Sequence, residues 1–234
     1  MDADEHKSHI KYDLKAVNAG HLVDSKKQGY LFTKRCIDIF VSFCALIVLS
    51  PIFLFVWFMD YCSKSNRGPL LYKQIRIGYH GEKFKMYKFR SMVVDADKKL
   101  YADKKLYAEY VANNYKLKPE DDPRITKIGF FLRKTSIDEI PQFINILKGD
   151  MSIIGPRPVV KEELVQYNQK KLLSVKPGAM GLWQASGRSM IGYPERANIE
   201  MNYIDHASLK FDFKIVWENI VKIFSPQLSN QVQH

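Results

Sequence analysis

The feature that most constrains this chain is an uncharged apolar stretch, IFVSFCALIVLSPIFLFVWFM, at residues 39–59. As one straight α-helix it would be about 31 Å long, enough to cross the hydrocarbon core of a bilayer. A cleaved signal peptide does not fit, because the stretch begins late, is long and lacks a small-residue cleavage site at its end. A buried helix of a soluble protein is disfavoured by the same length. The stretch therefore predicts a membrane segment.

Two features argue against a simple membrane-crossing helix. Pro51 removes one helical hydrogen bond and predicts a kink, with Ser50 beside it to satisfy a freed carbonyl. Both flanks are basic, and the positive-inside rule would place both in the cytosol. The flanking basic residues are Lys26, Lys27, Lys34 and Arg35 before the stretch, and Lys64, Arg67, Lys73 and Arg76 after it. A hairpin that enters one leaflet and returns satisfies both features, but on these features alone a kinked crossing helix stays open.

The charge balance points to an anionic partner. Lys and Arg outnumber Asp and Glu by 36 to 25, a net charge of +11. Nucleic acid, an anionic membrane surface and a phosphorylated substrate would all suit such a charge. We expect no nucleic acid, because the aromatic residues accompany apolar runs instead of alternating with a basic groove.

The cysteines suggest no metal site or disulfide framework. Cys36, Cys44 and Cys62 are widely spaced and lie in or beside the apolar stretch. We expect small buried apolar side chains, as in a protein of a reducing compartment.

The remaining pattern predicts one domain with polar ends. Residues 1–29 have the composition of a mobile arm, residues 30–225 form the domain, and residues 226–234 have that of a disordered tail. Residues 69–92 predict two strands around a turn bounded by glycines. Helical patterns occur at residues 96–107 (a tandem ADKKLY), 126–135, 137–147 and 194–224.

One short stretch raises a question of chemistry. SIDEIPQFINILKG, residues 136–149, begins with two adjacent carboxylates, Asp138 and Glu139. Ser136 and Glu139 have capping-box spacing and Gly149 supplies a stop, so helix capping alone explains the stretch. A helix N-terminus also binds phosphate and keeps a carboxylate ionised at neutral pH, and an ionised Asp can attack phosphorus. Capping and catalysis are compatible, and both stay open here.

Three motifs, in order along the chain, resemble the bacterial sugar transferases. They are KMYKFRSM (85–92), DPRITKIGFFLRKTSIDEIPQFINILKGDMSIIGPRP (122–158) and KPGAMGLWQASGR (176–188). The chain is similar, over about residues 31–225, to the small form of the monotopic polyprenyl-phosphate phosphoglycosyl transferases, which lacks an upstream multi-helix membrane domain. The resemblance implies a hairpin at about residues 36–62, broken at Ser50 and Pro51, and a location at the cytosolic face of the bacterial cytoplasmic membrane.

The resemblance also implies the chemistry. Asp138 would attack the sugar-bearing phosphate of a UDP-sugar and release UMP, and polyprenyl (undecaprenyl) phosphate would then take the sugar phosphate from the enzyme. Glu139 would assist as a base or order the metal, and both carboxylates would be ligands of Mg²⁺. The family's basic positions, implied as contacts to substrate phosphate, match Lys88, Arg90, Arg133 and Arg157. The segment SGRSMIGYPER (186–196) resembles the hexose-phosphate members, which favours galactose or glucose.

The expected fold is therefore α+β and mostly helical. It would have an N-terminal re-entrant membrane hairpin, a small β-hairpin and amphipathic interfacial helices around a compact cytosolic catalytic domain. The expected product is a polyprenyl-diphosphate sugar that begins a surface glycan, with downstream glycosyltransferases as partners. The alternative is a non-catalytic basic adaptor that binds anionic lipid at the membrane surface. It would explain the charge and the hairpin, but it needs neither Asp138 nor Arg157.

Overall fold

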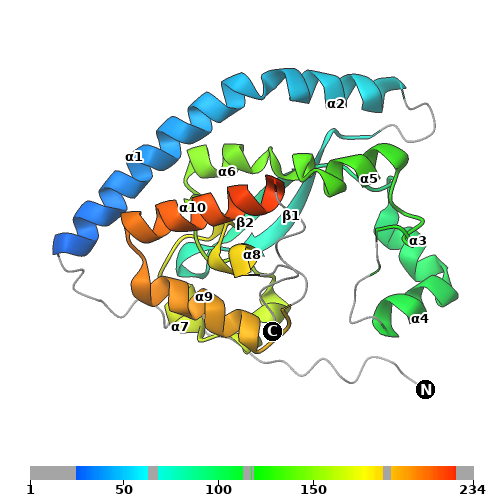
Figure 1. Ribbon diagram of the computed structural model, residues 1–234. Coiled ribbons are helices and arrows are strands. Elements are labelled where there is room, and N and C mark those ends of the chain that lie inside the picture. Colours follow the sequence, from blue (N-terminus) through cyan, green and yellow to red (C-terminus); the bar gives the residue numbers. More distant parts are fainter. Residues whose placement is uncertain (1–24, 63–67, 113–116, 118, 187–190, 225–234) are drawn as a thin grey trace.

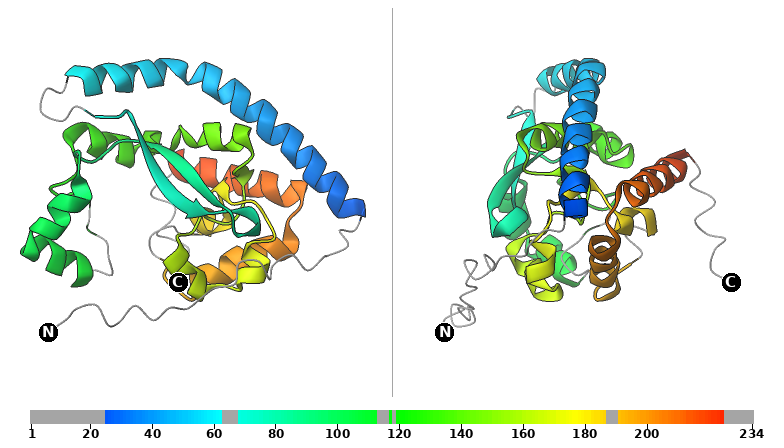
Figure 2. Two further views of the ribbon diagram at one scale, coloured as in Figure 1. Left: turned by 180° about the vertical axis from the view of Figure 1, so that it is seen from behind. Right: turned by 90° about the vertical axis from the view of Figure 1, so that its left-hand side faces the viewer.

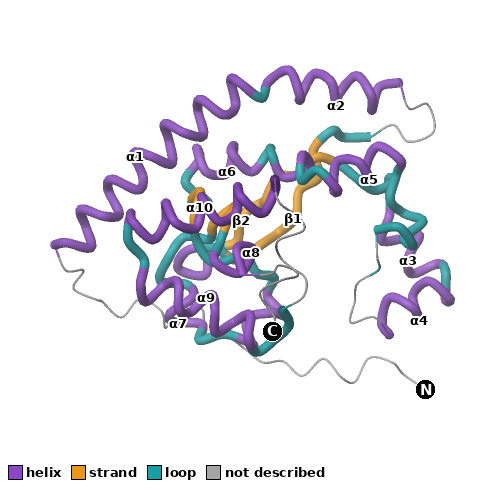
Figure 3. The backbone as a smooth tube through the Cα atoms, viewed as in Figure 1, coloured by secondary structure: helices purple, strands orange, loops and turns teal. Residues whose placement is uncertain are grey.

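The computed structural model describes residues 25–62, 68–112, 117, 119–186 and 191–224 (Figure 1). The helices are α1 (Ser25–Val48), α2 (Ser50–Cys62), α3 (Ala96–Ala102), α4 (Lys104–Ala112), α5 (Lys127–Lys134), α6 (Gln142–Lys148), α7 (Gln169–Leu172), α8 (Leu182–Ser186), α9 (Glu195–His206) and α10 (Leu209–Phe224). The 3₁₀ helices are η2 (Tyr79–Gly81), η3 (Ile137–Glu139) and η4 (Lys161–Gln166), and the strands are β1 (Leu71–Ile77), β2 (Lys83–Phe89), β3 (Ser152–Ile154) and β4 (Gly178–Met180). These elements confirm the mostly helical α+β fold class (Figure 3). The expected tail and residues 1–24 of the expected arm lie outside the described residues.

Helices α1 and α2 form a bent pair along one side of the molecule, opposite α7 and α9 (Figures 1 and 2). Within the described residues, no single helix is long and apolar enough to cross a membrane, but Gln28–Val48 and Ser50–Cys62 meet that test together, with a bend of 51° between them. The bend lies at the predicted Ser50–Pro51 pair. Pro51 has no N–H for the Ile47 carbonyl, and the Ser50 hydroxyl donates to that carbonyl instead, at 2.8 Å.

The outward side of this pair is strongly apolar. Its exposed large apolar residues are Leu31, Phe32, Ile39, Phe40, Val41, Phe43, Ile47, Val48, Leu54, Phe55, Trp57, Phe58 and Tyr61. So large an exposed apolar surface is typical of a membrane or protein contact. Cys36 and Cys62 are also exposed, so the expectation that they are buried is wrong, because both lie on sides of the helices that the domain does not cover.

The opposite side of α1 is polar and is attached to the domain. Lys34 pairs with Asp212 of α10 at 2.6 Å. The Arg35 guanidinium donates to the carbonyls of Ile146 and Leu147 at 2.6 and 2.8 Å. The Asp38 carboxylate accepts from the Ser152 hydroxyl and the Ile153 N–H at 3.1 and 2.9 Å. The N-terminal half of α1 is thus a structural part of the domain.

Strands β1 and β2 form the predicted hairpin. They pair antiparallel from Leu71 opposite Phe89 to Ile77 opposite Lys83. The turn between them includes His80 and Gly81, both with positive φ (55° and 80°). Strands β3 and β4 form a separate parallel pair, in which Ser152 lies opposite Gly178.

The predicted single helix over residues 96–107 is instead two helices, α3 and α4, separated by Asp103. The Asp103 backbone is extended, and its carboxylate accepts from the backbone N–H groups of Lys105 and Leu106, both at 3.0 Å. This is the arrangement of an N-cap residue, which begins a new helix. The two copies of the ADKKLY repeat therefore fall on different helices.

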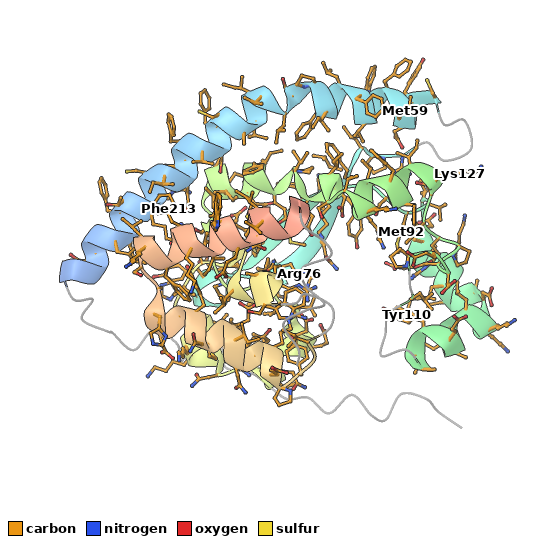
Figure 4. All side chains as sticks on the ribbon, viewed as in Figure 1. Met59, Arg76, Met92, Tyr110, Lys127 and Phe213 are labelled. Atoms are coloured by element: carbon orange, nitrogen blue, oxygen red, sulfur yellow. The ribbon has the colours of Figure 1, made fainter. Side chains whose placement is uncertain are left out.

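The C-terminal helices close the domain. The helical pattern predicted over residues 194–224 corresponds to α9 and α10, with a break at Ala207. Ile154, Tyr203, Ile204 and Ile215 form a buried apolar cluster between β3 and these helices. Helix α10 has an exposed apolar side that includes Phe213, labelled in Figure 4, and Trp217.

Candidate active site

The two adjacent carboxylates lie on η3, between α5 and α6. Ser136 before it has φ 57° and makes no side-chain capping bond, so the predicted capping box is wrong. The backbone turns at Ser136, forms one 3₁₀ turn, and enters α6 only after Pro141. Asp138 is therefore not at the N-terminus of an α-helix, and the expectation that a helix dipole keeps it ionised is wrong. The predicted stop at Gly149 is confirmed, because this residue ends α6 in the left-handed conformation.

The position of η3 depends on a close contact between α5 and the segment after β2. Thr126 caps α5, and its backbone N–H donates to the Ser91 carbonyl at 3.1 Å. A Cβ atom on Gly129 would lie 1.8 Å from that same carbonyl oxygen, so only glycine allows the approach. The Arg133 guanidinium then donates to the Ser91 hydroxyl at 2.8 Å. These contacts bring η3, next along the chain, against the end of β2.

Asp138 is the buried member of the pair, with 7% of its surface exposed. Burial raises the pKa of its carboxyl to about 6, Glu139 also raises it, and Lys88 and Arg133 oppose the rise. At pH 7 the ionised form still outnumbers the protonated form by about ten to one. Asp138 is therefore an ionised, poorly hydrated carboxylate beside two cations.

Glu139 and the neighbouring cations complete this cluster. The Lys88 ammonium lies 2.7 Å from Glu139 Oε1, and the Glu139 side chain is 46% exposed. Burial lowers the pKa of Arg133, and Asp138 opposes that effect. One carboxylate is thus buried and the other faces solvent, with Lys88 paired to Glu139 and Arg133 close to Asp138.

The cluster lies directly under α2. Ile137 and Ile140, which flank the two carboxylates, pack against buried Val56 of α2, Phe89 of β2 and Leu132 of α5. An apolar layer therefore connects the carboxylate pair to the bent helix pair.

Arg90 and Arg157 are placed differently from Lys88 and Arg133. Arg90 pairs with Asp60 at the end of α2 and donates from Nε to the Pro69 carbonyl at 2.9 Å. Arg157 lies after β3, where its guanidinium is 3.8 Å from Glu163. The structure thus gathers Lys88 and Arg133 around the carboxylates, links Arg90 to the end of α2, and puts Arg157 in a separate group.

Comparison with known proteins matches residues 29–226 to the model of the bacterial sugar transferase family. The chain belongs to the bacterial sugar transferase family. An undecaprenyl-phosphate galactose phosphotransferase of Salmonella typhimurium is 41% identical over 82% of this chain and 40% of its own length. The exopolysaccharide production protein ExoY of Sinorhizobium fredii is 42% identical over 80% of this chain and 84% of its own. A UDP-glucose:undecaprenyl-phosphate glucose-1-phosphate transferase of Klebsiella pneumoniae is 35% identical over 91% of this chain and 44% of its own length. The chain thus spans less than half the length of two of these relatives.

Asp138 and Glu139 could supply only some of the ligands of a divalent metal ion. Among the residues that the structure describes, no group of three or more His, Cys, Asp or Glu side chains could hold a metal ion. Mg²⁺, however, is commonly held by one or two carboxylates together with substrate phosphates and water. Asp138 and Glu139 supply those carboxylates, so the donor set suits Mg²⁺ that arrives with a phosphorylated substrate.

Two residues of this sugar transferase site were not anticipated from the sequence. Ser91 orients Arg133, and Asp60 pairs with Arg90. Asp60 carried a signal that could have been used, because it is the first charge after the apolar stretch and a buried arginine is its natural partner. Ser91 carried none, since its role depends on how α5 packs.

Proposed function

We propose that this chain is a phosphoglycosyl transferase that moves a hexose-1-phosphate from a UDP-sugar to undecaprenyl phosphate. The observation that carries the proposal is the buried Asp138 carboxylate close to Lys88 and Arg133, on a turn packed against α2. The family membership supports it, and so do the printed names of the relatives from Salmonella and Klebsiella. Those names favour galactose or glucose as the hexose. The name of the ExoY relative favours exopolysaccharide synthesis as the process.

The first half-reaction uses Asp138 as the nucleophile. One carboxylate oxygen attacks the phosphorus that carries the sugar, a bond to Asp138 forms, and the bond to the UMP oxygen breaks, so UMP leaves. Lys88 and Arg133 neutralise charge on the phosphoryl oxygens. Glu139, the exposed carboxylate, assists by holding Lys88 in place.

In the second half-reaction, a phosphate oxygen of undecaprenyl phosphate attacks the same phosphorus and releases the Asp138 carboxylate. A bound Mg²⁺, held by Asp138 and Glu139, would supply further neutralisation of phosphate charge. The site lies under α2, so a lipid acceptor can reach it without leaving the bilayer. This proposal places both ends of the α1–α2 pair on the cytosolic side, as a re-entrant hairpin.

The decisive experiment separates the two half-reactions. Purified protein with a UDP-hexose and Mg²⁺, but no lipid acceptor, should release one UMP per active site and keep the sugar phosphate on the peptide that contains Asp138, as seen by mass spectrometry. Asp138→Asn should abolish both signals, whereas Asp205→Asn, the same change on the exposed side of α9, should abolish neither. If no UDP-sugar yields UMP, the proposal fails and the lipid-binding adaptor becomes the better account.

A further inference from the structure

We propose that Asn145 is a positioning residue for the reaction, because it fixes β2 so that Lys88 lies beside the carboxylate pair. Asn145 is a residue of α6 and is fully buried, so it acts on the substrate only through other residues. This inference rests on the proposed function, since it explains how the cation near Asp138 is held. Helix α6 lies between α1 and the β1–β2 hairpin and bonds to both (Figures 1 and 2).

The side-chain amide of Asn145 pairs with the outer edge of β2. Its Oδ1 accepts the Tyr87 N–H at 2.9 Å, and its Nδ2 donates to the Lys85 carbonyl at 2.8 Å. In a β-strand, the carbonyl of one residue and the N–H of the residue two positions later point to the same edge, where a neighbouring strand would bond to both. Strand β1 is the neighbour of β2 in this two-stranded sheet. The Asn145 amide therefore takes the place of a peptide group of a third strand.

The amide of Asn145 is itself held firmly. Its Nδ2 also donates to the Asp150 carboxylate at 3.0 Å, so both N–H groups and the oxygen of the amide are bonded. Its backbone carbonyl accepts the N–H groups of Gly149 and Asp150, each at 3.0 Å. The Arg35 guanidinium of α1 donates to the carbonyls of the two residues that follow Asn145. The amide therefore has one orientation, on a turn that is anchored from both sides.

Two contacts join β2 to the segment of η3 and α6. One is the buried amide of Asn145, which bonds next to Lys88 in the chain. The other is the pair of Lys88 with Glu139 on η3, at 2.7 Å, with side chains that are 25% and 46% exposed. So open an ion pair contributes little on its own and cannot hold a strand in place. The buried bonds of Asn145 are therefore the contacts that set where Lys88 lies.

Apolar packing between α6 and β2 does not replace these bonds. Met86 and Ile146 belong to one buried apolar cluster. Apolar contact is non-directional and tolerates a small slide of the strand, whereas hydrogen bonds have narrow ranges of distance and angle. A misplacement of about 1 Å can slow an enzyme reaction about a hundredfold. Loss of the Asn145 bonds should therefore slow the reaction at Asp138 through the position of Lys88.

A paired substitution isolates the contact with β2. Asn145→Asp keeps the acceptor for the Tyr87 N–H, but it loses the donor to the Lys85 carbonyl and brings two carboxylates together. Adding Asp150→Asn removes that repulsion and restores a hydrogen bond between positions 145 and 150, so the bond to Lys85 is the one that is missing. If the paired variant does not fold, Asn145→Ser takes its place in each comparison.

The matched control is Asn219→Asp on α10. Asn219 is 3% exposed, and its Nδ2 donates to the Ile215 carbonyl at 2.9 Å. This control makes the same change in another buried amide. Any effect that both variants share comes from loss of a buried hydrogen bond and not from β2.

Lys88 reports its own position without substrate. The purified full chain is treated briefly with acetic anhydride, and acetylation of Lys88 is measured by mass spectrometry of its peptide. Lys171 is the internal reference, because its pair with Asp205 has similar exposure, 29% and 53%. Lys88 should react at least threefold faster in the paired variant, since an amine released from Glu139 is more accessible, and at the wild-type rate in Asn219→Asp. Formation of the Asp138 adduct should slow at least tenfold in the paired variant and less than twofold in the control.

A double-mutant cycle separates positioning from a general loss of stability. If Asn145 acts through Lys88, the paired variant should slow adduct formation less than twofold when it is made in Lys88→Met, although the losses of stability still add. A further tenfold loss of rate in Lys88→Met would show that Asn145 supports the site by another route and would overturn the proposal. Unchanged acetylation of Lys88 in the folded paired variant would overturn it as well.

This inference and the proposed function can fail separately. If the adduct forms on Asp138 but the paired variant alters neither Lys88 acetylation nor the rate, the positioning role is wrong and the function stands. If Lys88 acetylation depends on Asn145 but no UDP-sugar ever labels Asp138, the covalent function is wrong and Asn145 still positions Lys88.

Discussion

The Lys88 ammonium and the Glu139 carboxylate lie 2.7 Å apart, although 51 residues separate them in the chain. Their side chains are 25% and 46% exposed. An ion pair this open contributes no more than about 1 kcal/mol to stability. Its importance lies in its position, because it holds a cation next to the buried carboxylate of Asp138.

Lys88→Met should therefore separate activity from stability. We expect formation of the Asp138 adduct to slow at least a hundredfold, because a cation beside the reacting phosphate is lost. The melting temperature in detergent should fall by only a few degrees. Lys171→Met is the matched control, since Lys171 and Asp205 form a pair with similar exposure, 29% and 53%, on α7 and α9. Equal loss of adduct in both variants would contradict this role for Lys88.

Gly129→Ala should damage the site through the backbone. The new methyl group would lie 1.8 Å from the Ser91 carbonyl oxygen, so α5 must move away from β2 and carry Arg133 with it. We expect a loss of about 1–3 kcal/mol in stability, together with slower adduct formation. Gly29→Ala is the control, because a Cβ there meets nothing within 4 Å and alanine favours the α1 helix. A Gly129→Ala protein as stable as the wild type would show that α5 can shift freely.

Pro51→Leu should change how the helix pair sits in the membrane. Leucine restores the N–H that the Ile47 carbonyl lacks, so the pair can straighten. With a membrane-impermeant thiol reagent on sealed cells, we expect Cys36 and Cys62 of the wild type to be unlabelled from outside. A fraction of Pro51→Leu molecules should become labelled at Cys62, and Ile52→Leu should behave as wild type. Outside labelling of wild-type Cys62 would rule out the re-entrant arrangement.

Glu200→Gln should change how stability depends on pH. The folded pKa of Glu200 is about 7 and the ordinary value is 4.5, so between these values the folded state holds more protons than the unfolded state. Stability from this group is therefore fully present below about pH 4.5 and is lost as the pH rises through 7. The difference in unfolding free energy between Glu200→Gln and the wild type should therefore shift in favour of the variant by up to about 3 kcal/mol between pH 5 and pH 8. Melting curves at the two values test this, with exposed Glu162→Gln as the control. A wild type and a Glu200→Gln protein with parallel pH profiles would contradict the prediction.

The sequence predicted the features that depend on local chemistry. The bend at Ser50 and Pro51 follows from one missing N–H, and the β-hairpin follows from alternation around glycines. The helix predicted at residues 126–135 follows from its apolar pattern and is observed as α5, from Lys127 to Lys134.

What local patterns could not predict depends on tertiary contacts. Ser136 and Glu139 are the residue types of a capping box. Because α5 packs on Ser91, however, the backbone is left-handed at Ser136 and then forms a 3₁₀ turn. The split of α3 from α4 depends on which of two possible states Asp103 adopts, helix interior or cap. The contact between Asn145 and β2 joins distant segments, and no spacing in the sequence reports it.

The polar side of α1 has a consequence for how the protein is made. Lys34 pairs with a residue 178 positions later, and Arg35 and Asp38 bond to groups 111 to 115 positions later. Helix α1 thus finds these partners only when the domain is nearly complete. Until then its apolar side can enter the bilayer, but its depth and tilt are not yet fixed. We therefore expect the final geometry of α1 to be set only when α10 has folded.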